Sequence, residues 1–127
     1  MSTSVRSARE VVELYNYSVW NDRNFDLLDE LLADQIVRHG VGDVVTLTKE
    51  QALKRVEDFW KSVAAVSFTL PVMIDGRDDE HVAIVYQADI TGLDGSTSGV
   101  ASIEVFHVVG GRITEVWNNP HQSGNWC

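Results

Sequence analysis

The sequence predicts an α+β fold in which three N-terminal helices pack in a curved, mainly antiparallel sheet. In the first half of the chain, apolar residues recur at the three- and four-residue spacing of amphipathic helices. From Val66 onward the spacing changes to two, which is typical of strands, and turn-forming residues separate the apolar runs. A sheet that curves around the helices would bury the apolar faces of both layers.

Composition and charge limit the functions that the chain can have. The 127 residues, 44% of them hydrophobic, fit one domain over 1–127. Ten Lys and Arg against nineteen Asp and Glu give a net charge of -9, with no basic run. We expect no nucleic acid partner and no membrane partner, because phosphates would be repelled. No apolar signal segment or long apolar span is visible, so we expect a cytoplasmic protein.

Nothing in the sequence indicates a metal or a cofactor. Cys127 is the only cysteine, and a frayed terminal residue is a better interpretation of it than a reactive thiol. The histidines have no metal-ligand spacing, and no glycine run matches a phosphate or dinucleotide loop. We therefore expect no metal and no cofactor.

Apolar residues at helical spacing predict the first two helices. The first covers about residues 4–20, with a face made by Ala8, Val11, Val12, Tyr15 and Val19. The second follows shortly, and Asn24 can cap its N-terminus. Its buried stripe consists of Phe25, Leu28, Leu31 and Leu32.

A short strand and a third helix follow. The strand is predicted over residues 36–41, with Val37, His39 and Val41 on one face. The third helix begins at Thr48, where Gln51 completes a capping box. Its apolar face consists of Leu53, Val56, Phe59, Trp60 and Val63.

Four further strands complete the predicted sheet. The first contains apolar residues in alternation, namely Val66, Phe68, Leu70, Val72 and Ile74. A turn over 75–79 leads to a strand over 82–91, and a loop over 92–99 follows. The last two strands, within 103–119, flank Gly110-Gly111, a pair suited to a tight hairpin turn at positive φ.

Four segments resemble the nuclear transport factor 2-like superfamily, and within it the SnoaL-like polyketide cyclase and ketosteroid isomerase branch. They are Val11–Tyr15, Asn24–Asp34, Val37–Gly40 and Phe106–Trp117, which appear in the family's order along nearly the whole chain. The resemblance implies a cone-shaped fold. It also implies a range of functions, because this fold carries isomerases, dehydratases, cyclases, epoxide hydrolases and proteins without activity.

The resemblance also implies candidate catalytic residues. Related ketosteroid isomerases polarise a carbonyl with a tyrosine on the first helix and an acid on a late strand, where this chain has Tyr15 and Glu104. The isomerase base lies at the corner that here contains His39. Polyketide cyclases carry an acid just beyond the position of Trp117, but this chain has Asn118, which cannot exchange a proton.

Strand alternation places Glu104 on one face with Val100, Ser102 and Phe106. Beside these residues the carboxylate would be desolvated and its pKa raised, as a catalytic acid or base requires. The alternative is that this face of the sheet is exposed to solvent. For His39, a role in the pocket competes with that of a core histidine bonded to the backbone.

Further residues are candidates for substrate contacts. Aromatic residues are candidates to line the pocket, although aromatics at helical spacing more often belong to the core; they are Tyr17, Trp20, Trp60 and Phe106. Asn118 and Asn119 can donate to a substrate oxygen or simply end a strand. His107 is expected to have a structural or interface role, and His81 and His121 are expected to lie in loops.

These residues lead to a functional hypothesis with one alternative. The hypothesis is an enzyme that acts on a small hydrophobic molecule by proton transfer, with His39 moving the proton, Glu104 as its partner, and Tyr15 and Asn118 holding the substrate oxygen. The alternative is a ligand-binding or dimerisation module without chemistry. We also expect a homodimer through the outer sheet face that carries Ala101, Ile103, Val105 and His107.

Overall fold

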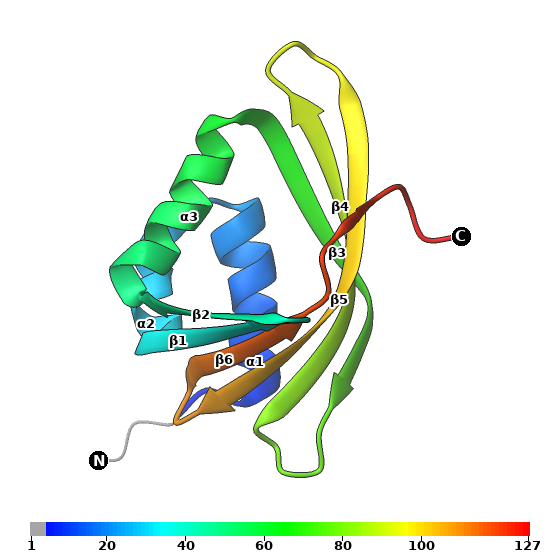
Figure 1. The fold of residues 1–127 in the computed structure, drawn as a ribbon. Coiled ribbons are helices and arrows are strands. Elements are labelled where there is room, and N and C mark those ends of the chain that lie inside the picture. The colour runs from blue at the N-terminus through cyan, green and yellow to red at the C-terminus, as the bar shows by residue number, and fades with distance from the viewer. Residues whose placement is uncertain (1–4) are drawn as a thin grey trace.

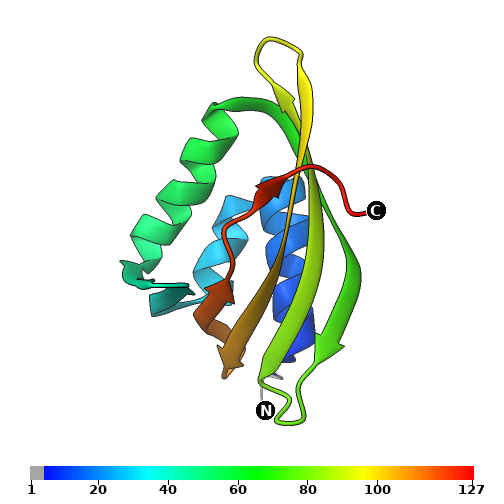
Figure 2. The same cartoon turned by 45° about the vertical axis from the view of Figure 1, so that its right-hand side comes forward.

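A strongly curved sheet holds the helices in its hollow side (Figure 1, Figure 2). This computed structural model describes residues 5–127, and it confirms the predicted α+β fold. The helices are α1 (Ala8–Leu14), its continuation η1 (Tyr15–Asn21), η2 (Phe25–Leu27), α2 (Leu28–Leu31) and α3 (Lys49–Lys61). The strands are β1 (Leu32–Gly40), β2 (Asp43–Thr48), β3 (Val63–Asp75), β4 (His81–Gly92), β5 (Thr97–Val109), β6 (Arg112–Asn118) and β7 (Gln122–Ser123).

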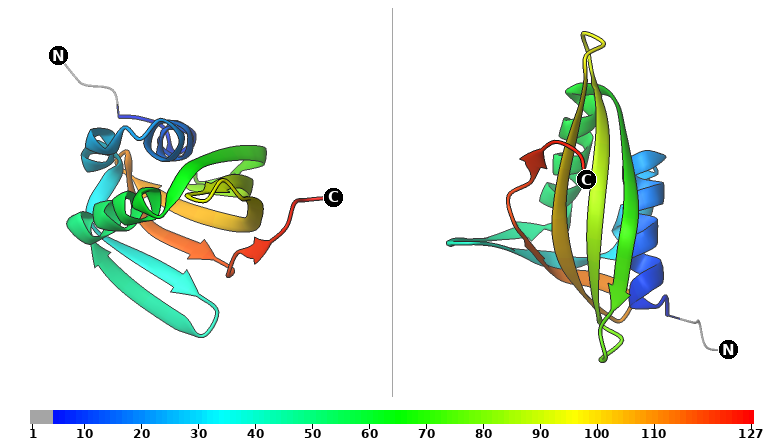
Figure 3. Two further views of the ribbon diagram at one scale, coloured as in Figure 1. Left: turned by 90° about the horizontal axis from the view of Figure 1, so that it is seen from above. Right: turned by 90° about the vertical axis from the view of Figure 1, so that its right-hand side faces the viewer.

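The strand order is β2-β1-β6-β5-β4-β3, and β7 pairs with the free stretch of β5 beyond β6. Only β1 and β6 pair in parallel; the other described pairs are antiparallel. Figure 3 shows β1 and β2 running across the direction of the long strands β3, β4 and β5. This bend creates the hollow in which the helices lie.

The first helix begins later than predicted and changes its geometry. Its N-cap is Ser7, which forms a capping box with Glu10, while the expected start near residue 4 falls outside the described residues. From Tyr15 the helix widens into the π-helix η1, a geometry that often marks functional sites. At its end the Asn21 side chain bonds the backbone of β3 at both its amide and its carbonyl.

The second helix is shorter than predicted, and its predicted cap is wrong. Asn24 makes no capping bond through its side chain; its backbone N–H donates to the Ser18 carbonyl at 2.9 Å. The 3-10 turn η2 and the short helix α2 follow. Leu28 and Leu31 are buried as expected, but Leu32 already belongs to β1.

The strand β2 was not predicted from the sequence. The chain turns at Gly42, whose φ of +81° suits glycine, and β2 then pairs with β1 at the edge of the sheet. Most β2 residues are exposed, so no alternation of buried and exposed positions revealed the strand. Val41 was expected in β1 but lies in the turn, 85% exposed. The capping box of α3, Thr48 with Gln51, is confirmed.

The apolar alternation of β3 is interrupted by a bulge. Thr69 pairs with Gln87 and Val72 with Val85, so β3 contains one more residue than β4 across this stretch, where Pro71 lies. The extra residue reverses the side-chain direction. Val72 therefore lies on the outer face of the sheet and is 43% exposed, although it continues the pattern of the inner residues.

The predicted hairpin between β5 and β6 is confirmed, with Gly110 at φ +59° and Gly111 at φ +79°. Between sheet and helices lies the core, which includes Val11 of α1 and Phe106 of β5, both completely buried. Within residues 5–127, no helix has the length and apolar character needed to span a bilayer.

Candidate functional site

A cavity of about 160 Å³ lies between the helices and the hollow side of the sheet. Its charged and polar lining comes from η1, β1, α3, β4, β5, the end of β6 and the loop after β6. It consists of Tyr15, Asn16, Arg38, Arg55, Tyr86, Glu104, Asn118 and His121. Its apolar lining consists of Trp20, Phe59, Phe68, Ala88, Ile90 and Val100. The cavity therefore combines an aromatic wall with a small number of ionisable groups, as small-molecule sites commonly do.

Glu104 points into this cavity. Its side chain is only 12% exposed, and Oε2 lies 3.4 Å from Arg38 Nη2. Burial raises the pKa of Glu104 above its ordinary value, and the positive charges of Arg38 and Arg55 oppose that rise. The desolvated carboxyl that the sequence predicted at this position is confirmed, and its ionic partner is Arg38.

Two cross-strand neighbours share the Glu104 face. Asn118 of β6 lies directly opposite Glu104 in the antiparallel register, so both side chains line the cavity. Tyr86 of β4 also lines it. Burial first, and then the charge of Glu104, raises the pKa of Tyr86 to about 12, so its hydroxyl keeps its proton near neutral pH.

Tyr15 lines the cavity from the first π-helical residue of η1. Its ring packs edge-on against Phe106, with 5.7 Å between the ring centroids. Phe106 is itself completely buried and faces a separate, much smaller cavity of about 10 Å³. Phe106 therefore positions Tyr15 and does not line the main cavity.

The structure places His39 on the opposite side of the sheet from Glu104. Arg38 and His39 are successive residues of β1, so their side chains point to opposite faces. His39 Nε2 lies 2.8 Å from Glu115 Oε2, and the imidazole stacks on Trp117 with 4.8 Å between centroids. The expectation that His39 and Glu104 face each other in one pocket is wrong.

Three of the remaining candidates also lie apart from the main cavity, whereas Trp20 lines it. The Tyr17 hydroxyl accepts a hydrogen bond from the Leu70 backbone amide at 3.2 Å, which ties it to β3. The Trp60 indole donates to the Trp20 carbonyl at 2.8 Å, and it packs against the core. Asn119 is exposed outside the cavity.

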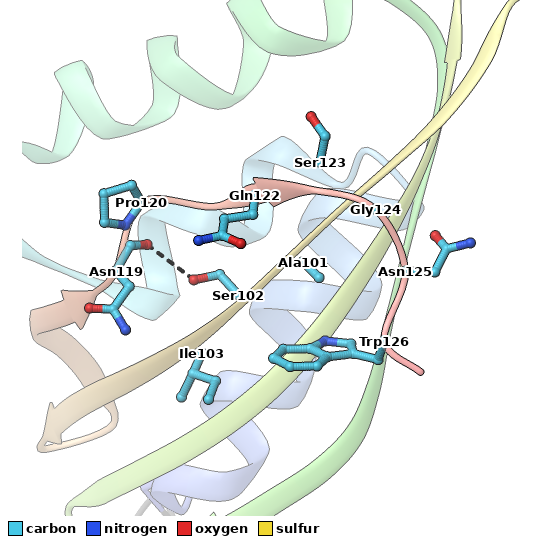
Figure 4. Close-up of a pocket in the computed structure, with 10 residues that line it drawn as sticks. All are labelled: Ala101, Ser102, Ile103, Asn119, Pro120, Gln122, Ser123, Gly124, Asn125 and Trp126. Carbon is cyan, nitrogen blue, oxygen red and sulfur yellow. Dashed lines mark hydrogen bonds between the residues drawn. The ribbon is translucent and has the colours of Figure 1, made fainter.

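A second hollow, of about 290 Å³, lies beneath the C-terminal segment and includes Asn119 and Trp126 (Figure 4). The Asn119 carbonyl accepts a hydrogen bond from the Ser102 hydroxyl at 3.0 Å. The Gln87 side chain donates to the Gly124 carbonyl and accepts from the Trp126 backbone amide. The Trp126 indole donates to the Tyr86 carbonyl, so the segment is fastened to β4. This hollow is shallow and lacks ionisable lining residues, so it offers little for chemistry.

Four residues that line the cavity were not predicted from the sequence, namely Arg38, Arg55, Tyr86 and His121. For Arg38 a signal existed, since it shares strand parity with Ile36, which is almost completely buried. For Arg55 the signal was its helical spacing from Ala52 and Phe59, both of which pack against the core. His121 lies in a loop as expected, and that loop borders the cavity.

A network of histidines and carboxylates occupies the outer face of the sheet. Glu115 bridges His39 and His107, with 3.2 Å between its Oε1 and His107 Nδ1, and His107 Nε2 lies 2.9 Å from Glu80. His81, expected in a loop, begins β4 and stacks on His107 with 4.1 Å between centroids. Across residues 5–127, no three such side chains are arranged to hold a metal ion.

Solved structures with the same fold include enzymes of several kinds. A candidate polyketide cyclase from Acidithiobacillus ferrooxidans is 20% identical, with a TM-score of 0.75, over 93% of this chain and 89% of that chain. A SnoaL-like polyketide cyclase from Agrobacterium tumefaciens is 13% identical, with a TM-score of 0.74, over 93% of each chain. An LEH-like epoxide hydrolase from M. tuberculosis is 19% identical, with a TM-score of 0.71, over 88% of this chain and 80% of that chain.

No curated protein sequence matches this chain. At these identities the solved structures establish a shared fold and leave the reaction open. The family model of the SnoaL-like domain, however, matches residues 11–116, which run from within α1 to within β6 and include the cavity residues Tyr15, Arg38, Arg55 and Glu104. The chain belongs to the SnoaL-like domain family.

Proposed function

We propose that the protein is a cofactor-independent enzyme that transfers a proton next to a carbonyl or hydroxyl group of a small hydrophobic metabolite. The observation that carries this proposal is the buried Glu104 carboxyl, which opens on an aromatic cavity. Because burial raises its pKa, this carboxyl is better suited to exchange protons near neutral pH than an exposed one. Isomerisation, dehydration and aldol-type cyclisation all require such a step.

The cavity residues have distinct roles in this proposal. Glu104 removes and returns the proton, and Arg38 orients its carboxylate. The Tyr15 hydroxyl and the Asn118 amide donate hydrogen bonds to the substrate oxygen, where negative charge develops. His39 has no part in the chemistry, because its side chain lies on the other face of the sheet.

Hydrogen–deuterium exchange tests the proposal without knowledge of the natural substrate. Small aryl ketones such as phenylacetone are incubated with the protein in D₂O, and exchange at the carbon next to the carbonyl is followed by NMR. We expect exchange above the buffer rate with the unmodified protein and loss of it in Glu104→Gln. Glu50→Gln, on the exposed face of α3, is the matched control and should exchange normally.

A ligand-binding module without chemistry is the second candidate. The observation in its favour is the mainly aromatic and apolar wall of the cavity, which would hold a small molecule whether or not a reaction follows. Binding of aryl ketones without deuterium exchange would favour the module over the enzyme.

We also propose that two copies of the chain associate through the outer face of the sheet. Apolar residues with considerable exposure lie there on neighbouring strands, among them Val72 (43%), Ile74 (59%) and Ile103 (44%). Val85 pairs with Val72 on one side and with Ile103 on the other, which makes the apolar surface continuous across β3, β4 and β5. A second copy would remove this surface from water.

A further inference from the structure

The cavity has an excess of positive charge. Two guanidinium groups, Arg38 and Arg55, line it together with one carboxylate, Glu104. Arg38 is paired with Glu104, whereas no carboxylate within residues 5–127 lies at ion-pair distance from Arg55. These three groups together therefore carry a net charge of about +1 even when Glu104 is ionised.

Arg55 of α3 lines the cavity. The residue is exposed as a whole, yet it lines both the main cavity and the small one beside Phe106. Burial and then the charge of Arg38 lower the pKa of Arg55, so the two guanidinium groups are close enough to repel each other. An anion placed between them would remove this repulsion.

We propose that Arg55 binds the carboxylate of a small keto acid with an aromatic or alicyclic body, so that the substrate of the cavity is an organic anion. Guanidinium groups bind carboxylates with two parallel hydrogen bonds, which fixes the orientation of the ligand. The apolar body packs against Trp20, Phe59 and Phe68. This inference rests on the proposed function, because it assigns the substrate class of the same cavity.

The proposed chemistry follows from this orientation. With the carboxylate on Arg55, the ketone oxygen lies between Tyr15 and Asn118, and the neighbouring C–H lies beside Glu104. Glu104 takes the proton, the C–H electron pair forms the C=C bond of an enolate, and the carbonyl pair moves to the oxygen held by Tyr15 and Asn118. Protonated Glu104 then returns the proton to carbon or oxygen, so no other reactant is required.

The preference for an anion is confined to the cavity, because the rest of the protein is acidic. A chain with a net charge of -9 repels anions over most of its surface. Positive charge concentrated in a cavity with apolar walls is less screened than charge in water, so it can overcome that repulsion. The cavity volume of about 160 Å³ further favours a small acid over an extended one.

Isothermal titration with phenylacetate and its neutral isostere phenylacetamide tests the inference. We expect phenylacetate to bind at least about ten-fold more tightly than phenylacetamide. Arg55→Gln should weaken phenylacetate binding about ten-fold or more and so remove this difference. Lys54→Gln, one residue away on α3 and outside the cavity, removes the same charge and should keep the difference. Glu104→Gln should tighten phenylacetate binding, because it frees Arg38.

Equal affinity for the two probes, no binding of either, or an equal effect of Lys54→Gln and Arg55→Gln would each overturn the inference. These titrations involve no turnover, so their failure is distinct from failure of the proposed function. Loss of deuterium exchange in Glu104→Gln without any preference for the acid would leave proton transfer standing and remove only the anionic substrate.

Discussion

Arg38 and His39 are adjacent in β1, yet each is held by a glutamate on a different face of the sheet. Arg38 Nη2 lies 3.4 Å from Glu104 Oε2 in the inner cavity, and His39 Nε2 lies 2.8 Å from Glu115 Oε2 on the outer face. The sheet therefore separates two sets of ionisable groups. The inner set lies with the aromatic cavity and is the candidate for chemistry, and the outer set lies on the same face as the proposed dimer surface.

Replacing Glu104 of the inner set should abolish deuterium exchange, whereas replacing His39 of the outer set should not. Glu104→Gln keeps the shape of the side chain and removes the proton acceptor, so we expect deuterium exchange to fall about 100-fold or more. The melting temperature should change little, because relief of the desolvated charge offsets the weaker contact with Arg38. His39→Ala should leave exchange within about two-fold of normal. A loss in His39→Ala equal to that in Glu104→Gln would contradict this division.

Asn118 should hold the substrate oxygen next to Glu104. Asn118→Ala removes a donor worth about 1.5–3 kcal/mol towards a developing charge, so exchange should slow by roughly ten-fold or more with the fold intact. Asn118→Asp places a second carboxylate opposite Glu104 and should raise the pKa of Glu104 further. If Asn118→Asp gained ring-closing activity, the asparagine would not mark a mechanism different from that of the polyketide cyclases.

The outer network should make stability depend on pH. Hydrogen bonds to Glu80 and then to Glu115 raise the pKa of His107 in the folded chain above its ordinary value of 6.5. Its contribution to stability is therefore fully present below pH 6.5 and is lost as pH rises through the folded pKa. Thermal denaturation should show His107→Gln destabilised most at low pH and least at high pH. A deficit independent of pH would contradict the assignment.

The dimer should depend on the apolar outer face. Ile103→Lys places a charge in the middle of that face, opposite Val85, so the protein should become monomeric. Light scattering at micromolar concentration measures the mass of the unmodified protein and the variant. Val41→Lys, in the exposed turn after β1, is the control and should remain dimeric. An unmodified protein that is already monomeric would refute the dimer.

Local signals in the sequence predicted much of the fold. The capping box of Thr48 and the Gly110-Gly111 turn both depend on neighbouring residues and proved correct. The strand β2 was missed because it lies at an edge, where exposure removes the alternation. The bulge near Pro71 and the π-helix at Tyr15 arise from pairing with other elements, which no single segment encodes.

The site was predicted only in part, for a similar reason. Strand parity identified the residues that share a face with Glu104, and that face is the inner one. His39 was chosen because the resemblance to ketosteroid isomerases places their base at that corner. Parity could not tell which face of β1 points inward, so the neighbouring Arg38 was overlooked. Asn118 lies opposite Glu104 only because of the pairing register between β5 and β6, which the structure shows.

The titration of Glu104 itself is the most direct test that the cavity can transfer a proton. Its carboxyl ¹³C resonance can be followed by NMR against pH and assigned by its disappearance in Glu104→Gln. We predict that it titrates above the ordinary value of 4.5, because burial outweighs the guanidinium groups, and that Arg55→Gln moves it higher still. A titration at or below 4.5 would show an ordinary ion-paired carboxylate and would contradict the account.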